Sequence, residues 1–221
     1  MLQLYKSCIF VVKIYHYTLL GGEILNFKNN IIDKNDSLPS SSFHEWFDAI
    51  IKALIIILII LTFCFKVCTV VGGSMNNTLS NGDKLVITNF FYKPKENDII
   101  VFHQTGEILN EPCVKRIIAT GDKWVKIDYN TCTLYVSEDN VFDVDDIVDE
   151  SSYAYFDIGS YKLSGTLETY VPKGYLFVMG DNRNNSTDSR ATEIIGLVDE
   201  KTVLGKVILR ISPSDKLGFI K

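Results

Sequence analysis

The sequence predicts a mostly β protein, in which an antiparallel, barrel-like β domain follows a single transmembrane α-helix. Two observations predict this fold. Residues 53–65 are an almost uninterrupted run of isoleucine, leucine and other apolar side chains, and beyond residue 72 many short β-branched and aromatic runs are separated by turn signals. The chain has 221 residues, of which 47% are apolar, which is enough for one sizeable domain and an anchor.

The first 48 residues are expected to form a tail that is partly disordered or lies at a membrane interface. Residues 8–12 are apolar, but Lys13 and His16 follow, so the run is too short to span a bilayer. Residues 27–42 are rich in asparagine, serine and lysine and are typical of a linker.

Residues 49–71 are expected to form the transmembrane anchor. A bilayer core requires about 20 apolar residues in a helix. This range supplies them if Lys52 and Lys66 extend their ammonium groups toward the lipid headgroups. The alternative is a shorter core helix, but the run has no polar face. A cleaved signal peptide is not favoured, because no A-x-A-like site follows the run.

Residues 72–221 are expected to form the β domain. The predicted strands are residues 84–88, 98–102, 114–118, 124–127, 134–136, 175–179 and 203–209. An acidic insertion is expected at about residues 128–165, because eight acidic residues and no lysine or arginine lie between Glu138 and Asp157. We interpret it as a solvated loop between strands, since its spacing matches no known calcium loop.

Charge and cysteine content narrow the functional classes. The net charge is −5, which argues against a general nucleic-acid surface. The five cysteines form neither a CxxC pair nor a cluster with histidine at metal spacing, so no structural zinc is expected. Free thiols at Cys113 and Cys132 are favoured over a disulfide, but spacing alone leaves the bridge open.

Two short segments suggest hydrolytic chemistry. Ser74 follows Gly72 and Gly73 just beyond the apolar segment, and Lys115 lies within an apolar run where an ammonium group is costly. A serine hydroxyl becomes a good nucleophile when a base removes its proton, and a neutral lysine can be that base. Taken separately, a serine after two glycines is more typical of a flexible linker. A lysine in an apolar run is more typical of a solvated residue at the edge of a sheet. As a base, Lys115 needs a pKa well below its ordinary value of about 10.4.

A third segment, residues 180–190, directly follows the predicted strand at 175–179. Its hydroxyl at Ser186 can orient a lysine amine, and Asp188 can pair with an arginine to hold the loop. Taken alone, the segment is also compatible with a polar turn that has no catalytic role.

The order of these motifs resembles the bacterial type I signal peptidase (leader peptidase) family, whose members are Ser/Lys-dyad serine proteases. The resemblance covers roughly residues 50–210. The matching motifs are Ser74-Met75-x-x-Thr78-Leu79, Tyr92-x-Pro94-x-x-x-Asp98-Ile99-Ile100-Val101-Phe102, Lys115-Arg116-Ile117-Ile118 and Gly180-Asp181-Asn182-Arg183-x-x-Ser186-x-Asp188-Ser189-Arg190. It implies a single-pass plasma-membrane protein with a β catalytic domain on the extracytoplasmic side. Its expected partners are secretory preproteins and membrane lipid.

The resemblance also implies roles for individual residues. Ser74 is the expected nucleophile and Lys115 the general base, with Ser186 beside the lysine and Asp188 in the supporting network. Position 72 contributes to the oxyanion hole, which Gly72 can do only through its backbone. The residues expected to line the cleft are Met75, Leu79, Cys113 and Val114. The substrate is expected to have small residues at −1 and −3, and the reaction requires no metal or organic cofactor.

Three departures from the family pattern leave an alternative open. Asn77 stands where the family usually has proline, Asn97 where it has glycine, and residues 118–122 are one residue short. A divergent, membrane-tethered β domain that binds peptides or partners without catalysis is therefore the alternative. A soluble, self-cleaving repressor-type peptidase does not suit the isoleucine-rich segment. A Ser-His-Asp enzyme is also disfavoured, because His103 is the only histidine after residue 44 and no motif surrounds it.

Overall fold

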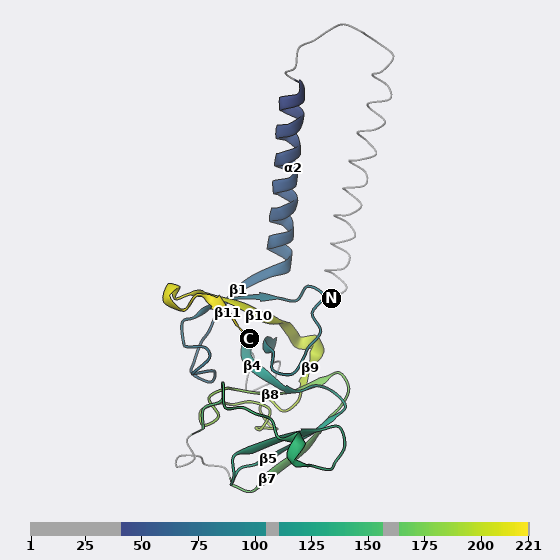
Figure 1. Cartoon of the computed structure of the whole chain (residues 1–221), viewed down its shortest axis with the longest axis vertical. Helices are drawn as coiled ribbons and strands as arrows, with labels where there is room; N and C mark the ends of the chain where they lie inside the picture. Colours follow the sequence, from purple (N-terminus) through teal and green to yellow (C-terminus); the bar gives the residue numbers. More distant parts are fainter. Residues whose placement is uncertain (1–40, 105–110, 157–163, 221) are drawn as a thin grey trace. The chain divides into compact units, whose positions relative to one another are not determined.

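The structure, a computed structural model, describes residues 41–104, 111–156 and 164–220. It is mostly β, with antiparallel sheets preceded by one long apolar helix, as the sequence predicts (Figure 1). The chain divides into two compact units, residues 1–54 and 55–221. Most of the N-terminal tail expected at residues 1–48 lies outside the described residues.

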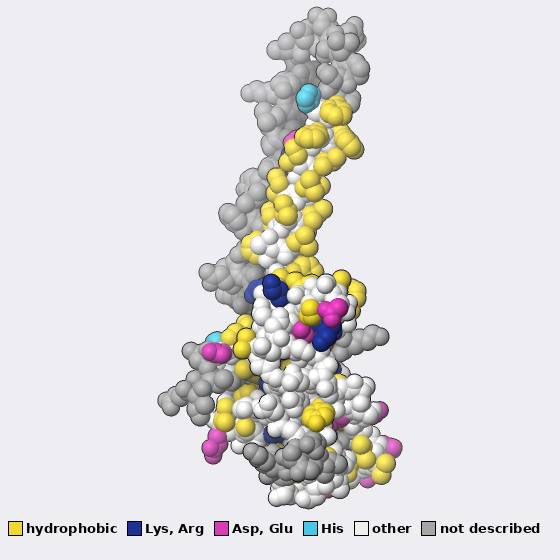
Figure 2. All heavy atoms as spheres, turned by 90° about the vertical axis from the view of Figure 1, so that its left-hand side faces the viewer, with side chains coloured by type: hydrophobic (Ala, Val, Ile, Leu, Met, Phe, Trp, Pro, Cys, Tyr) yellow, Lys and Arg dark blue, Asp and Glu magenta, His cyan; other side chains and the backbone are white. Residues whose placement is uncertain are grey.

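Helix α2 spans Ser41–Cys64, and its part from Phe43 to Cys64 is long and apolar enough to cross a membrane. Apolar side chains cover its surface (Figure 2). Three of its polar side chains take part in local pairing. Lys52 forms an ion pair of 2.7 Å with Asp48, and the hydroxyl of Thr62 donates to the Leu58 carbonyl at 2.7 Å. This pairing suits an apolar environment, where an unpaired polar group is costly.

The helix expected to continue to Val71 ends instead at Cys64. Strand β1, Phe65–Thr69, follows directly and pairs antiparallel with β2, Lys84–Thr88. The β-branched side chains of Val67 and Thr69 favour an extended backbone, and the pairing with β2 satisfies the backbone groups on one side of this segment. The apolar composition of this segment favours a continuation of the helix, but pairing with β2 makes it a strand instead.

The larger sheet has eight strands, seven of them in the order β1-β2-β10-β3-β4-β8-β9, and β11 pairs with β10. Every pairing between named strands is antiparallel. The strands not yet bounded are β3 (Ile99–His103), β4 (Pro112–Ala119), β8 (Tyr175–Met179), β9 (Val198–Asp199), β10 (Val203–Ser212) and β11 (Gly218–Phe219). The short 3-10 helices η3 (Glu200–Thr202) and η4 (Ser214–Lys216) flank β10.

The smaller sheet has the order β6-β5-β7, and its strands β5 and β7 are labelled in Figure 1. Its strands are β5 (Lys123–Asp128), β6 (Thr133–Ser137) and β7 (Thr166–Val171). The predicted acidic insertion comprises β6, the 3-10 helix η1 (Val144–Asp146) and the segments that lead to β7. The insertion, expected to be solvated, is buried in part: the Glu150 side chain is only 10% exposed and forms an ion pair with Arg183.

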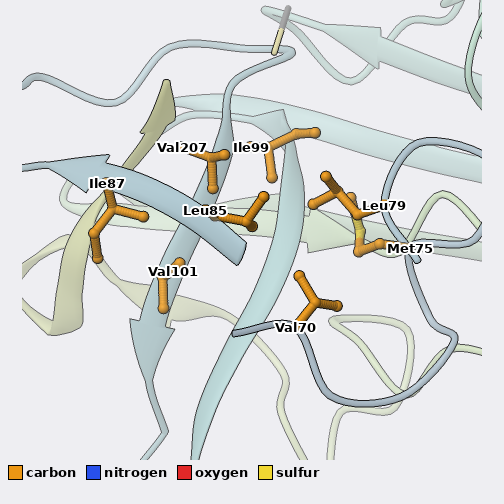
Figure 3. Close-up of a cluster of buried hydrophobic side chains, with 8 residues drawn as sticks. All are labelled: Val70, Met75, Leu79, Leu85, Ile87, Ile99, Val101 and Val207. Carbon is orange, nitrogen blue, oxygen red and sulfur yellow. The ribbon is translucent and has the colours of Figure 1, made fainter. Parts of the chain in front are cut away.

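Strand β3 lies at the centre of the larger sheet and is buried on both faces. Alternation of its side chains places Ile99 and Val101 in one apolar cluster, and Ile100 and Phe102 in another. The first cluster also contains side chains from the segment that carries Ser74 (Figure 3). The core therefore fixes the position of that segment against the sheet.

Candidate active site

The segment around Ser74 is a compact turn held by its own backbone. The amides of Thr78 and Leu79 both donate to the Met75 carbonyl, at 3.1 and 2.8 Å. The side chains of Met75 and Leu79 point into the core, where they are 1% and 0% exposed (Figure 3). In the structure they anchor the turn, and their predicted contact with a substrate stays a prediction.

Lys115 lies on strand β4, opposite Ile100 of β3. Its side chain enters the domain rather than solvent, and the residue is 5% exposed. The Nζ atom of Lys115 lies 2.7 Å from Oγ of Ser74, at hydrogen-bond distance. Two residues 41 positions apart in sequence are therefore in direct contact, as the sequence motifs suggested.

Burial lowers the pKa of Lys115 from its ordinary value, and the negative charge of Asp188 only partly opposes this effect. An amine with a lowered pKa is neutral over a wider pH range and can accept a proton. At 2.7 Å from the hydroxyl of Ser74, it can remove the serine proton directly. The pair therefore has the geometry and the electrostatics of an activated nucleophile.

The loop after strand β8 holds the backbone of the Ser74 turn. The Asn182 amide donates to the Ser74 carbonyl at 3.0 Å, and its side-chain Nδ2 donates to the Gly73 carbonyl at 3.0 Å. The loop approaches so closely that a Cβ atom on Gly180 would overlap the Ser74 carbonyl oxygen. Glycine is therefore required at position 180 for this contact.

A buried ion pair supports the same loop. Arg116, the residue after Lys115, makes a bidentate contact with Asp181, with Nε–Oδ1 and Nη2–Oδ2 distances of 2.9 and 2.8 Å. The hydroxyl of Thr78 also donates to the Asp181 carboxylate. Strand β4, the Ser74 turn and the loop thus meet at one carboxylate, and their relative positions are fixed by charge-assisted hydrogen bonds.

Asp188 pairs with an arginine, as predicted. Its carboxylate accepts two hydrogen bonds of 2.8 Å from Arg190 and one of 2.9 Å from the Gly180 amide. Burial alone would raise the pKa of Asp188, but these hydrogen bonds and the Arg190 charge hold it below its ordinary value. The carboxylate therefore stays ionised and keeps a negative charge near Lys115.

Ser186 lies at the predicted place in the loop. Its Oγ atom is buried next to Gly180, and its side chain helps to lower the pKa of the nearby Asp188 carboxylate. Its expected contact with the lysine amine stays a prediction.

Gly72 differs from its expected role. Its amide donates to the side-chain Oδ1 of Asn81 at 3.0 Å, so this N–H is not free for an oxyanion. The Ser74 amide, in contrast, has no acceptor within the described parts of the chain. Of the Gly72 and Ser74 amides, the Ser74 N–H is therefore the one that is available to an oxyanion.

Cys113 and Val114 are half-buried on strand β4, and each packs against a different apolar cluster. Both keep some exposed surface, so their predicted contact with a substrate stays open. The four described cysteines, Cys64, Cys68, Cys113 and Cys132, are free thiols.

The departures from the family pattern leave the site intact. Asn77 has a φ of 86°, which proline cannot adopt, so this turn differs from one with proline at that position. Asn97 has a φ of 68°, a left-handed conformation that asparagine tolerates better than most residues other than glycine. Neither residue contacts the Ser74–Lys115 pair in the described hydrogen-bond network.

Sequence reasoning assigned no role to three residues that the structure places in the site: Thr78, Arg116 and Asn182. Each belongs to one of the motifs, and all three hold the Ser74 turn or its supporting loop. The detectable signal was the position of Arg116 beside Lys115, since two adjacent basic residues in an apolar strand require separate partners.

Comparisons with known proteins agree with these observations. The family model described as signal peptidase, peptidase S26, matches residues 43–212. Signal peptidase IB of Staphylococcus aureus (strain MRSA252) is 31% identical over 194 residues, covering 79% of this chain and 92% of the relative. The chloroplastic thylakoidal processing peptidase 1 of Arabidopsis thaliana is 31% identical over 157 residues, covering 66% and 41%. The crystal structure of a signal peptidase I from Enterococcus faecalis V583 shares 25% identity, with a TM-score of 0.33, and covers 52% of this chain and 97% of that one.

Proposed function

The chain belongs to the signal peptidase family, peptidase S26, and we propose that it is a serine endopeptidase with Ser74 as nucleophile and Lys115 as general base. Membership makes it a peptidase that removes signal peptides from preproteins. The observation that supports the finer assignment is the 2.7 Å contact between Lys115 Nζ and Ser74 Oγ, in a site where burial lowers the pKa of the lysine.

The proposed reaction is acyl transfer in two steps. Neutral Lys115 takes the proton of Ser74, and Oγ attacks the carbonyl carbon of the substrate's −1 residue. Lys115 then gives the proton to the leaving amine as the peptide C–N bond breaks. The same lysine then deprotonates a water molecule, which attacks the acyl carbon, and returns the proton to Ser74 Oγ as the ester bond breaks and the signal peptide is released. Ser74 N–H is the proposed oxyanion donor.

Strand β4 offers a place for the substrate. Residues 112–116 pair with β3, whereas the pairing with β8 begins only at Arg116. Within the described residues, the backbone of residues 112–115 therefore has no strand partner on the side away from β3. This unpaired edge ends at Lys115. An extended peptide can add there as a strand, which would bring its −1 carbonyl to Ser74. Its side chains at −1 and −3 would then share one face.

Cleavage of a preprotein by the purified full-length chain tests this function. We expect one cut after a small −1 residue, located by N-terminal sequencing of the mature product. Replacing a −1 alanine by tryptophan is expected to lower kcat/KM by about 100-fold or more, because a shallow pocket excludes the larger ring. The same replacement at −2, which points to the other face, is the control. Equal losses at −1 and −2, or no cleavage, would reject the proposal.

We further propose that the chain is a single-pass plasma-membrane protein whose catalytic domain is extracytoplasmic and contacts lipid. Phe90 and Phe91 are exposed to 56% and 89%, which excludes core packing for both. They follow Thr88, which pairs with Phe65 at the start of β1, directly after the apolar helix. A double Phe90→Ser, Phe91→Ser variant is expected to lose preprotein cleavage in lipid vesicles but not in detergent. If the variant and the wild type were equally active in vesicles, the proposal that this turn contacts lipid would be rejected.

A further inference from the structure

The segment formed by residues 150–156, which we call the strap, crosses the loop that supports the Ser74 turn. It belongs to the acidic insertion and lies outside every motif discussed above. Its backbone pairs with the loop at two points. The Tyr155 amide donates to the Asp181 carbonyl at 2.8 Å, and the Arg183 amide donates to the Tyr155 carbonyl at 3.1 Å. The strap therefore forms an additional layer behind the site.

Side chains of the strap enclose Arg183, which is almost completely buried. Both carboxylate oxygens of Glu150 accept hydrogen bonds from the Arg183 guanidinium. The rings of Tyr153 and Phe156 lie 5.9 and 5.6 Å from the Arg183 Cζ atom, within cation–π range. Among the described ion pairs, Glu150 is the only carboxylate that faces this buried charge.

Arg183 transmits this contact to the site. Its Nε donates to the Gly180 carbonyl at 3.0 Å, and its own carbonyl accepts from Arg190, the partner of Asp188. Between Gly180 and Arg183 lies Asn182, which holds the Ser74 and Gly73 carbonyls. Hydrogen bonds at both ends, joined by the covalent backbone of residues 180–183, thus connect Glu150 to the backbone of the proposed nucleophile.

We propose that Glu150 is a positioning residue for the cleavage reaction, acting through Arg183 on the loop at residues 180–182 to keep Ser74 Oγ in line with Lys115. This inference rests on the proposed function. Glu150 touches neither the substrate site nor the dyad, so its loss changes geometry rather than chemistry. A buried guanidinium that loses its carboxylate is expected to seek solvent or a new partner and to move the loop with it.

A Glu150→Gln variant of the full-length chain tests the proposal. We expect kcat per folded molecule to fall by about 10- to 100-fold, because small displacements of reacting atoms are costly. KM is expected to stay within about twofold, because the strap does not contact the open edge of β4. Asp145→Asn is the matched control: it removes an exposed charge from the same insertion and is expected to keep wild-type activity. Glu150→Asp, which retains the carboxylate, is expected to recover part of the loss.

A double-mutant cycle with Asn182→Ala distinguishes positioning from a general loss of stability. If Glu150 acts through the loop, the double variant loses less than the product of the two single effects. Hydrogen exchange at the amides of Asn182 and of the Ser74 turn is expected to accelerate in Glu150→Gln and not in Asp145→Asn, and this readout does not depend on activity. A wild-type kcat per folded molecule, unchanged exchange, or strictly multiplicative losses would overturn the inference. Inactivity of the wild-type chain toward preproteins would instead count against the proposed function.

Discussion

A Lys115→Met variant is expected to lose preprotein cleavage by about 1,000-fold or more while the chain remains folded and becomes more stable at neutral pH. Methionine has a similar volume and no amine, so the Ser74 hydroxyl loses the only base within hydrogen-bond distance among the described residues. Arginine is not an equivalent replacement, because a guanidinium stays protonated and cannot accept the serine proton.

The gain in stability follows from the direction of the pKa shift. Burial lowers the pKa of Lys115 in the folded chain below the value of about 10.4 that it has when unfolded. Between these two values the unfolded state binds the proton and the folded state does not, so Lys115 destabilises the fold increasingly as the pH decreases through this window. Methionine has no such proton, and its buried methylene and thioether groups keep the apolar contacts.

Chemical denaturation at pH 7 and a cleavage assay on the same preparation measure the two effects together. Lys126→Met is the matched control, because this strand lysine is partly exposed and pairs with Glu168 at the surface. Its activity and stability are expected to stay near those of the wild type. Residual cleavage above about one-hundredth of the wild-type rate, or a lower stability for Lys115→Met, would contradict a buried, neutral base.

The second large effect is expected for Ser74→Ala, which removes the attacking oxygen. Cleavage is expected to fall to the limit of detection, since no covalent intermediate can form. Stability is expected to change by no more than about 1 kcal/mol, because the side chain is half-buried and makes one described hydrogen bond, to Lys115. The turn itself remains held by Met75, Leu79 and Asn182, none of which is altered.

Mass spectrometry and kinetics provide the test. A trapped acyl-enzyme is expected on wild-type Ser74 under rapid quench and is expected to be absent from the alanine variant. Ser80→Ala, the same change six positions further along the chain, is expected to cleave normally. The double variant of Ser74 and Lys115 is expected to be no less active than either single variant, because the two residues act as one unit. Activity in Ser74→Ala would favour a different nucleophile; an inactive wild-type chain would favour the peptide-binding alternative.

Local sequence patterns predicted the regular parts of the β domain well. Each predicted strand corresponds to an observed one, and β2 and β8 have the predicted bounds, because alternation and turn residues report directly on a pleated, half-buried backbone. Strand β1 was missed, because its composition continues that of the helix and its conformation depends on pairing with β2. Strand β7, at Thr166–Val171, was missed because it directly follows the expected insertion and no strand was predicted between that insertion and residue 175.

The site was predictable where the chemistry requires a particular residue type. A lysine in an apolar strand and a serine after two glycines each have a commoner structural explanation when taken alone, but the order of the motifs indicated a pair, and the structure brings the two side chains together. The burial of Met75 and Leu79 was not predictable, because adjacency to Ser74 in sequence does not determine which way a side chain points. Glu150 was not predictable as a partner of Arg183, since the contact spans 33 positions and an acidic run usually marks a solvated surface.

The pH dependence of kcat/KM for preprotein cleavage by the wild-type chain tests the central claim most directly, because it reports the protonation of the free enzyme's base. The account predicts a rising limb whose midpoint lies below about 10.4, in the direction that burial moves the pKa of Lys115. A limb centred near 10.4, the value of a solvated lysine, would mean that the amine is charged at working pH and cannot accept the Ser74 proton.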